Sequence, residues 1–402
     1  MEADLLKLLR GKIYTLDPPQ NTCSYTVVTN TFVCTIVRLE EVRSIVNAPM
    51  LVHIFLNFPH LITISMFVFS FDRLLLLIQV IMFYTNVTRI KHFFILGFPG
   101  LSQEYYGPVS ALLFVFFLAI AGGNIFILVF VKCERSLHKP TYLIFCHLAL
   151  TDLLFGTVTL PKIISKYWFD DSIISFYGCF VQMYFVHFLG ASHSFILMVM
   201  ALDRFIAICA PLRYTALFTN NTASVLCGIS WIWPMCWMVV IVVDALRLPY
   251  CNLNIITQCY CDHQAITVLG CEAVREVQEV AFGGAMFSLL LPLGFIIVSY
   301  FVIIVAVIRM TSSNSSRMLA LSTCLPQIII TFLYYMPRCF VYMANIVGFT
   351  FGVPIRVVIV MLYSILPAAI NPLIYCFKTK DIKEHLKKKL VIMKINNSTT
   401  TG

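Results

Sequence analysis

Charged residues are scarce in this chain: Asp, Glu, Lys and Arg make up only 12% of its 402 residues, whereas 60% are hydrophobic. A soluble domain carries about 25% charged residues, so this composition excludes an ordinary soluble fold. Stretches of about 20 apolar residues recur along the chain and indicate several membrane crossings. The short alternating runs of a transmembrane β-barrel are not the pattern here, so we expect an all-α membrane protein.

Other functional signatures are also missing from the sequence. It has no metal-ligand motif and no G-x-S-x-G elbow, so neither an enzyme nor a cofactor is expected. The net charge of +9 comes without a basic patch interleaved with aromatic residues, which argues against nucleic-acid binding. Two matching halves, typical of a secondary transporter, and a polar pore-lining helix, typical of a channel, do not stand out either.

Seven apolar segments are long enough to cross a membrane as helices. We place them at roughly residues 108–131, 141–164, 179–209, 223–246, 279–308, 318–344 and 354–377. Lys and Arg gather after the first, third, fifth and seventh segments, whereas the loops at the opposite ends are acidic. Because basic loops face the cytoplasm, we expect the C-terminus inside the cell and the segment before the first span outside it.

Cysteines on the expected outer side allow disulfides. The loop between the fourth and fifth spans contains Cys251, Cys259, Cys261 and Cys271, and Cys179 opens the third span on the same side. An extracellular loop is oxidising, but spacing alone does not fix which cysteines pair. A zinc site with His263 as one ligand is the alternative, although no four-ligand spacing is evident.

Polar residues inside the apolar spans point to a functional centre. A carboxylate such as Asp152, in the second span, is costly in a membrane and requires a polar partner. Asn124 in the first span and Asn371 in the seventh are the expected partners. Pro372 weakens the seventh helix next to this cluster, which suits a two-state switch. The alternative is a packed polar cluster that only fixes the register of the helices.

Six motifs, in matching order and spacing, resemble those of olfactory receptors, which are rhodopsin-like G-protein-coupled receptors. They are Leu137-His-Lys-Pro-Thr-Tyr142, Leu148-Ala-Leu-Thr-Asp152, Met200-Ala-Leu-Asp-Arg-Phe-Ile-Ala-Ile-Cys-Ala-Pro-Leu-Arg-Tyr214, Ser299-Tyr300, Leu321-Ser-Thr-Cys324 and Asn371-Pro-Leu-Ile-Tyr375. The resemblance covers roughly residues 82–390. The Leu-Gly-Phe-Pro-Gly-Leu run at 96–101 and the long loop after the fourth span favour the fish-type, or class I, branch.

The resemblance implies a seven-helix bundle that binds a small odorant and activates an olfactory-type stimulatory G protein, which raises cAMP. A non-olfactory rhodopsin-like receptor for another small ligand is the alternative, and a secondary transporter is a more remote one. An amine receptor would carry an Asp near Val186, where this chain has none. The basic stretch after Lys378 is expected to form a short amphipathic helix on anionic membrane lipid.

Specific residues take their expected roles from this resemblance. The implied disulfides are Cys179–Cys261 and Cys251–Cys271. The implied ligand pocket consists of Val186, His187, Gly190, Ala191, Gly284, Ala285, Ser288, Tyr335, Arg338, Met361 and Ser364, where the small residues leave volume. The implied activation switch consists of Asp203, Arg204, Tyr300, Asn371, Pro372 and Tyr375. A buried polar cluster joins Asn124, Asp152 and His193.

Several positions depart from the family pattern. His193 replaces a Glu that would join Asp152 in holding a sodium ion, so no metal site is assigned. A histidine there would make the resting state sensitive to pH or would be a hydrogen-bonded core residue. Thr141, Phe205 and Gln327 replace the usual Met, Tyr and His.

Arg338 is a cation within the apolar sixth span, directly after Pro337. A guanidinium there must reach outward or find an anion. One hypothesis is recognition of an acidic odorant, with His187 helping, and the other is an internal partner.

The residues before the resemblance are interpreted separately. We take 1–81 as an atypical N-terminal extension, either a gene-model artefact or a segment with no role in signalling, although its apolar stretch at 50–84 would allow an eighth span. A signal peptide would lie within about the first 30 residues and is not expected. Residues 82–390 form the receptor domain and 391–402 the tail. Asn86 begins a glycosylation motif on the expected outer side.

Overall fold

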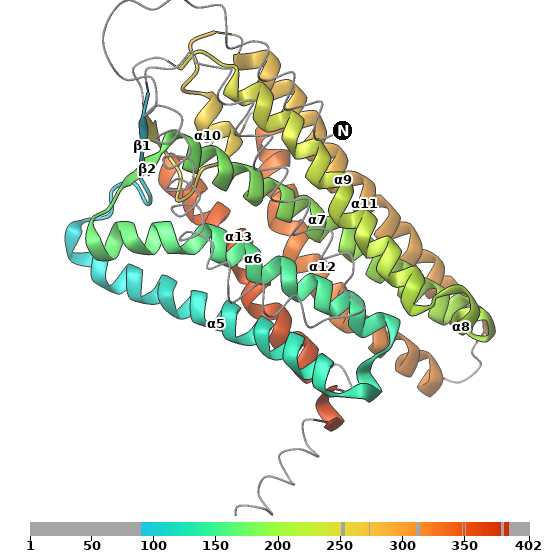
Figure 1. Cartoon of the computed structure of the whole chain (residues 1–402). Helices are drawn as coiled ribbons and strands as arrows, with labels where there is room; N and C mark the ends of the chain where they lie inside the picture. Colours follow the sequence, from blue (N-terminus) through green and yellow to red (C-terminus); the bar gives the residue numbers. More distant parts are fainter. Residues whose placement is uncertain are drawn as a thin grey trace, which may run out of the picture. The chain divides into compact units, whose positions relative to one another are not determined.

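A computed structural model of the chain describes residues 90–250, 254–272, 274–310, 314–347, 349, 351–378 and 382–385. All of them belong to the unit Met50–Gly402. Seven long helices run through this part of the chain (Figure 1): α5 (Tyr106–Cys133), α6 (Pro140–Phe169), α7 (Phe176–Cys209), α9 (Asn220–Leu246), α11 (Val274–Met310), α12 (Asn314–Ile346) and α13 (Val353–Lys378). Within the described residues, seven helices are long and apolar enough to cross a membrane. Each predicted span lies inside one of them, so the predicted fold class is confirmed.

Local sequence signals set the helix ends. Pro140 occupies the first turn of α6. A backbone N–H at this position would have no acceptor within the helix, so the missing N–H of proline costs no hydrogen bond. The side chain of Ser175 accepts a hydrogen bond from the N–H of Gly178 at the start of α7, and Thr219 caps α9 in the same way. Asp170 ends α6 in the left-handed region at φ 56°.

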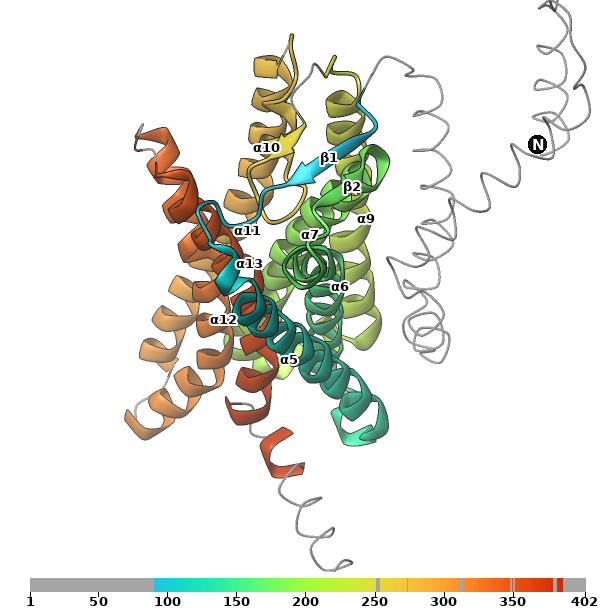
Figure 2. The ribbon, with the colours of Figure 1, turned by 90° about the vertical axis from the view of Figure 1, so that its left-hand side faces the viewer.

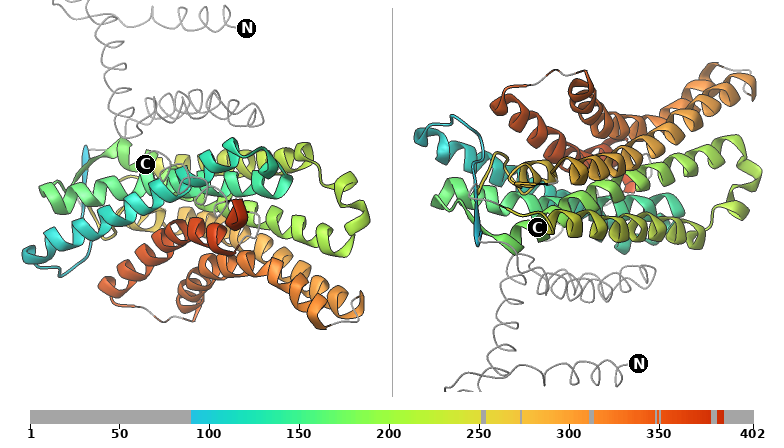
Figure 3. Two further views of the ribbon diagram at one scale, coloured as in Figure 1. Left: turned by 90° about the horizontal axis from the view of Figure 1, so that it is seen from below. Right: turned by 90° about the horizontal axis from the view of Figure 1, so that it is seen from above.

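Helix α7 is the centre of the bundle. It packs against α6, α9, α11 and α12, and 78% of its most apolar stretch is buried, compared with 28% for α5 and for α11. Helix α13 packs against α5, α6 and α12, and the views in Figures 2 and 3 show α12 and α13 side by side. The second, third, sixth and seventh long helices, α6, α7, α12 and α13, therefore enclose an interior that can hold polar residues.

A three-stranded sheet covers the end of the bundle at which α7 begins (Figure 2). The central strand β1 (His92–Ile95) pairs antiparallel with β2 (Ile173–Ser175) and parallel with β3 (Ile255–Ile256). The chain then turns at Gly97, whose φ is +71°. A Cβ atom on Gly97 would lie 2.3 Å from the Tyr167 hydroxyl, so only glycine fits there.

The connections between the long helices are short, except for the one from α9 to α11. The segments outside the long helices contain α8 (Tyr214–Leu217), α10 (His263–Thr267) and the 3-10 turns η1 (Gln103–Tyr105), η2 (Arg135–Leu137) and η3 (Pro211–Arg213). Several sequence predictions lie outside the described residues: the extension 1–81 with its apolar stretch, Asn86, Cys251 and the tail 391–402. Of the amphipathic helix expected after Lys378, residues 382–385 are described and helical.

Candidate functional site

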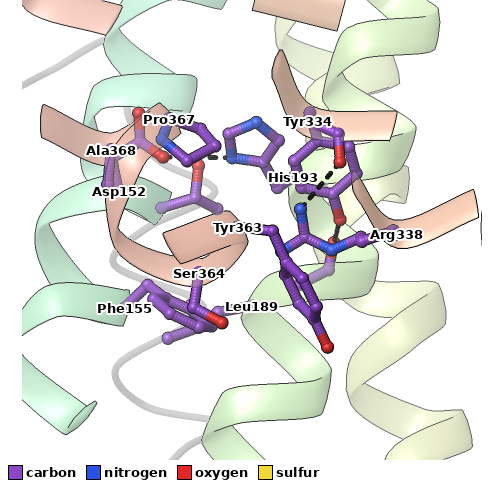
Figure 4. Close-up of a pocket in the computed structure, with 12 residues that line it drawn as sticks. Asp152, Phe155, Leu189, His193, Tyr334, Arg338, Tyr363, Ser364, Pro367 and Ala368 are labelled. Atoms are coloured by element: carbon purple, nitrogen blue, oxygen red, sulfur yellow. Dashed lines mark hydrogen bonds and ion pairs between the residues drawn. The ribbon is translucent and has the colours of Figure 1, made fainter. Parts of the chain in front are cut away.

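A cavity lies between α6, α7, α12 and α13 (Figure 4) and has an empty volume of about 280 Å³, including its open mouth. It is lined by Thr151, Asp152 and Phe155 from α6, Leu189, Gly190 and His193 from α7, Tyr334 and Arg338 from α12, and Tyr363, Ser364, Pro367 and Ala368 from α13. On each helix these residues are spaced by one, three or four positions, so they share one face. Apolar walls with a few converging polar groups are the usual lining of a small-molecule site.

A buried histidine–carboxylate pair forms one end of this cavity. His193 Nδ1 lies 3.1 Å from Asp152 Oδ1, and the two side chains are only 6% and 4% exposed. The other carboxylate oxygen accepts a hydrogen bond of 2.7 Å from Asn371 Nδ2. Both oxygens of Asp152 therefore have partners, and the cluster joins α6, α7 and α13. The expected contact between Asp152 and Asn371 is formed.

The expected contact between Asn124 and Asp152 is wrong. The amide nitrogen of Asn124 donates instead to the carbonyl oxygens of Ile120 (2.9 Å) and Ala368 (3.1 Å). Asn124 thus links α5 to the backbone of α13 and makes no hydrogen bond with the Asp152 carboxylate. The close approach of these helices is allowed at Gly123, where a Cβ atom would lie 3.0 Å from Pro372.

Arg338 and Tyr334 form the opposite side of the cavity. The Arg338 guanidinium carbon lies 3.9 Å from the ring centroid of Tyr334 and 4.7 Å from that of Tyr363. The Tyr334 ring also stacks on His193, with centroids 4.4 Å apart and planes 8° from parallel. A continuous row of contacts therefore runs from Arg338 through Tyr334 and His193 to Asp152, as the close-up in Figure 4 shows.

Only part of the predicted ligand set lines this cavity. Gly190, Arg338 and Ser364 do, and a Cβ atom added to Gly190 would meet nothing within 4 Å, which agrees with the predicted free volume. Gly284 is different, because a Cβ atom there would lie 2.3 Å from Trp237 Nε1. The expectation that Gly284 leaves space for a ligand is wrong, since its missing side chain accommodates the indole of α9.

The other predicted pocket residues have different surroundings. Ser288 and Tyr335 meet at Ser194, whose hydroxyl donates to the Ser288 carbonyl (2.8 Å) and lies 2.5 Å from the Tyr335 hydroxyl. Val186 and Met361 belong to an apolar core cluster. Neither Ala191 nor Ala285 lines the cavity.

The end of the bundle that carries the sheet also carries a disulfide, and we call it the disulfide end. Cys179 and Cys261 are bonded, as the resemblance implied, and their Cα atoms lie 5.4 Å apart. Cys271 is disulfide-bonded too, while Cys251, its implied partner, lies outside the described residues. The Cys261 N–H donates to the side chain of Gln182 (2.9 Å), which fixes the loop on α7.

His187 faces this loop rather than the cavity. Its Nε2 lies 3.4 Å from Asp262 Oδ1 and accepts a hydrogen bond of 3.2 Å from the N–H of His263. Burial, together with the neighbouring His187, lowers the pKa of His263 to about 4. No group of three metal-binding side chains occurs within the described residues, so the alternative of a zinc site there has no support.

A second polar cluster lies at the opposite end of α7. Arg204 donates two hydrogen bonds to Asp203 Oδ2, at 2.6 and 3.0 Å. Thr141 donates to the same oxygen (2.9 Å) and accepts from Arg204 (2.7 Å), while Tyr214 donates to the other oxygen (2.7 Å). Asp203 is only 1% exposed, so these bonds compensate a buried charge. Burial and the Asp203 carboxylate raise the pKa of Tyr214 to about 12, so its hydroxyl stays protonated.

The two tyrosines of the predicted switch lie on α13 and α11. Tyr375 is fully buried and stacks on Phe145 with ring centroids 4.5 Å apart. Tyr300 packs against the apolar cluster of Ile303, Val307 and Cys324. The structure therefore places Tyr375 beside α6 and Tyr300 beside α12.

Sequence reasoning missed several residues that line the site or complete its contacts. Tyr334 lies four positions before Arg338, a spacing that places both on one helix face and could have indicated their contact. Thr141 was noticed only as a departure from the family pattern, and its contacts with Asp203 and Arg204 give it a role. Tyr363 had no signal beyond its position next to Ser364.

Comparison with known proteins identifies the family. The family model described as olfactory receptor matches residues 112–393. Olfactory receptor 2AT4 from Homo sapiens is 35% identical over 298 residues, which cover 74% of this chain and 92% of that protein. Olfactory receptor 51E2 from Homo sapiens is 36% identical over 301 residues, which cover 72% and 90%.

A solved structure shows the same fold. The crystal structure of squid rhodopsin matches with a TM-score of 0.58 at 14% sequence identity, over 72% of this chain and 81% of that one. The seven apolar helices, the motifs and the relatives agree. The chain belongs to the olfactory receptor family: it is a multi-pass membrane receptor of the rhodopsin-like fold, for a small molecule and a G-protein partner, and it is not an enzyme.

Proposed function

We propose that a small odorant binds in the cavity between α6, α7, α12 and α13 and activates an olfactory-type stimulatory G protein, which raises cAMP. The observation that carries this proposal is the lining of the cavity, where polar groups converge between apolar walls. We extend the ligand set implied by the sequence with Tyr334 and Tyr363, which flank Arg338. The assignment to the fish-type branch stays a prediction.

The proposed orientation puts the disulfide end outside the cell. Disulfides persist in an oxidising compartment, and the loops at the opposite end are basic, which favours the cytoplasmic side. The N-terminus is then extracellular, with Asn86 available for glycosylation, and the C-terminal basic stretch meets anionic lipid of the inner leaflet. In the same proposal, residues 1–81 lie outside the receptor domain.

The proposed mechanism is a population shift. The ligand binds more tightly to the active arrangement of the helices and so raises the share of that arrangement. The clusters at Asp152 and Asp203 hold the resting arrangement, because each pairs a buried carboxylate across two or more helices. Rearrangement of Arg204, with Tyr300 and Tyr375, would open the cytoplasmic end for a helix of the G protein.

A cAMP reporter assay tests this function. Cells that produce the receptor and an olfactory-type stimulatory G protein are exposed to acids, alcohols, amino acids and steroids. At least one compound should raise cAMP in a concentration-dependent way, and the rise should disappear in matched cells without that G protein. Uptake of the compound or ion flux with no cAMP response would contradict the proposal and favour a transporter.

A shortened chain tests the domain boundary. A receptor that begins at Met82 should reach the surface and respond like the full chain. Loss of surface delivery or response would show that residues 1–81 have a role.

A further inference from the structure

We propose that the ligand of this cavity is a small carboxylate and that Arg338 binds its anionic group. This inference rests on the proposed function, because it names the chemical class of the compound that the cavity takes. The supporting observation concerns Arg338. This residue is a cation inside a membrane span, and it has no ionic partner in the described part of the chain.

The described residues accept few hydrogen bonds from the Arg338 guanidinium. Among the described residues, one of its five N–H donors is hydrogen-bonded, to the backbone oxygen of Tyr334 at 2.9 Å. Its other contacts are with the faces of two tyrosine rings. Aromatic faces attract a cation but accept no strong hydrogen bond, so the forked donors of the guanidinium stay available for a planar anion.

The carboxylate that shares the cavity does not serve Arg338. Asp152 is paired with His193 through one oxygen and with Asn371 through the other. Both oxygens of Asp152 therefore already have partners from the protein, whereas no carboxylate among the described residues pairs with Arg338. A cationic ligand would meet an uncompensated cation, whereas an anion would neutralise it.

The remaining lining sets the size and polarity of the ligand. Ser364 lies on the same wall as Tyr363, and its hydroxyl, 3.1 Å from that of Tyr260, is a further polar group for a carboxylate. Phe155 and Leu189 supply apolar walls. Because the empty volume of about 280 Å³ includes the open mouth, the enclosed space is smaller than this figure, which favours a short-chain or small aromatic monocarboxylate.

Binding at Arg338 would also act on the buried pair of His193 and Asp152. The Tyr334 ring contacts both the guanidinium and the His193 imidazole. A carboxylate that draws Arg338 away from this ring changes the packing on His193 and hence on Asp152.

Dose–response measurements on the full-length receptor test the inference. Short straight-chain monocarboxylic acids are compared with their methyl esters and with amines of equal chain length, together with a panel of unrelated neutral odorants. The acids should raise cAMP, and the esters and amines should be at least tenfold weaker. Arg338→Gln should raise the half-maximal acid concentration at least tenfold, and Arg338→Lys should restore part of the response, because it keeps the charge without the planar fork.

Arg356→Gln is the matched control, since Arg356 is a half-buried arginine of α13 that does not line the cavity. It should leave the acid response unchanged at equal surface level. If Arg338→Gln fails to reach the surface, the comparison of acids with esters on the unmodified receptor decides.

The outcomes separate this inference from the proposed function. A receptor that responds to neutral odorants but not to acids overturns the inference and leaves the function in place. An acid response that is equal in Arg338→Gln at equal surface level also overturns it. A receptor at the surface that responds to no compound overturns the proposed function together with the inference.

Discussion

Removing His193 alone should destabilise the helix bundle more than a double substitution that also removes the charge of its partner, Asp152. His193→Leu would leave the Asp152 carboxylate, 4% exposed, with Asn371 as its remaining partner among the residues that the structure describes. Removing one partner of a buried carboxylate in this way costs about 3–5 kcal/mol. Because the 2.7 Å bond from Asn371 remains, we expect the lower end of this range, about 3 kcal/mol.

The double variant His193→Leu/Asp152→Asn provides the contrast. It removes the histidine together with the charge of Asp152 and keeps an oxygen that can accept from Asn371. Its stability should therefore lie within about 1 kcal/mol of the unmodified protein, since replacing a whole buried pair is often neutral. At about 2 °C for each kcal/mol, the melting temperature should fall by about 6 °C in the single variant and by about 2 °C or less in the double one.

Thermal unfolding of the purified receptor in detergent measures these shifts. A thiol-reactive fluorophore reports unfolding, because the free cysteines Cys146 and Cys227 are buried in the folded protein. Asp152→Asn alone completes the double-mutant cycle. Equal melting temperatures for His193→Leu and the double variant would refute the reasoning, since they would show that His193 does not stabilise the buried carboxylate of Asp152.

Three further predictions concern the disulfide, the glycines and pH. Cys179→Ser opens a loop with a sequence separation of 82 residues, so unfolding should become easier by about 4.5 kcal/mol, and flow cytometry should show a large loss of surface receptor. Gly190→Ala should fold normally and alter the half-maximal ligand concentration. Gly284→Ala should lower the melting temperature, because its Cβ atom meets Trp237. A lower melting temperature for Gly190→Ala and an unchanged one for Gly284→Ala would contradict the assignment of the two glycines. Because burial lowers the pKa of His263 to about 4, its stabilising contribution should be complete above about pH 6.5 and lost as pH falls towards 4. Melting temperatures across this range should decline less in His263→Leu, and an equal decline would exclude this histidine as a cause.

The helices could be predicted from the sequence because lipid imposes a single requirement. A span must be apolar for about 20 residues and must satisfy its backbone internally, so composition alone locates it. The seven predicted segments accordingly fall within α5, α6, α7, α9, α11, α12 and α13. The disulfide Cys179–Cys261 came from the family resemblance, since cysteine spacing left several pairings open.

The site was only partly predictable because it depends on which helix faces which. A glycine predicts either free volume or close packing, and the opposing residue decides: Trp237 fills the space at Gly284, while Gly190 faces open space. In the same way, Asn124 has the right chemistry for a partner of Asp152 but lies against the backbone of Ala368. Tyr334 was missed because the sequence does not show that an aromatic ring separates Arg338 from His193.

The sheet at the disulfide end has a consequence for the design of chimeric receptors. Its three strands come from residues 92–95, 173–175 and 255–256, which lie before α5, before α7 and after α9. The last of these segments is joined to β1 by backbone pairing, and the same loop is joined to α7 by Cys261. A loop transplanted alone from a relative would lose its strand neighbour, so an exchange of ligand specificity at this end should move all three segments together.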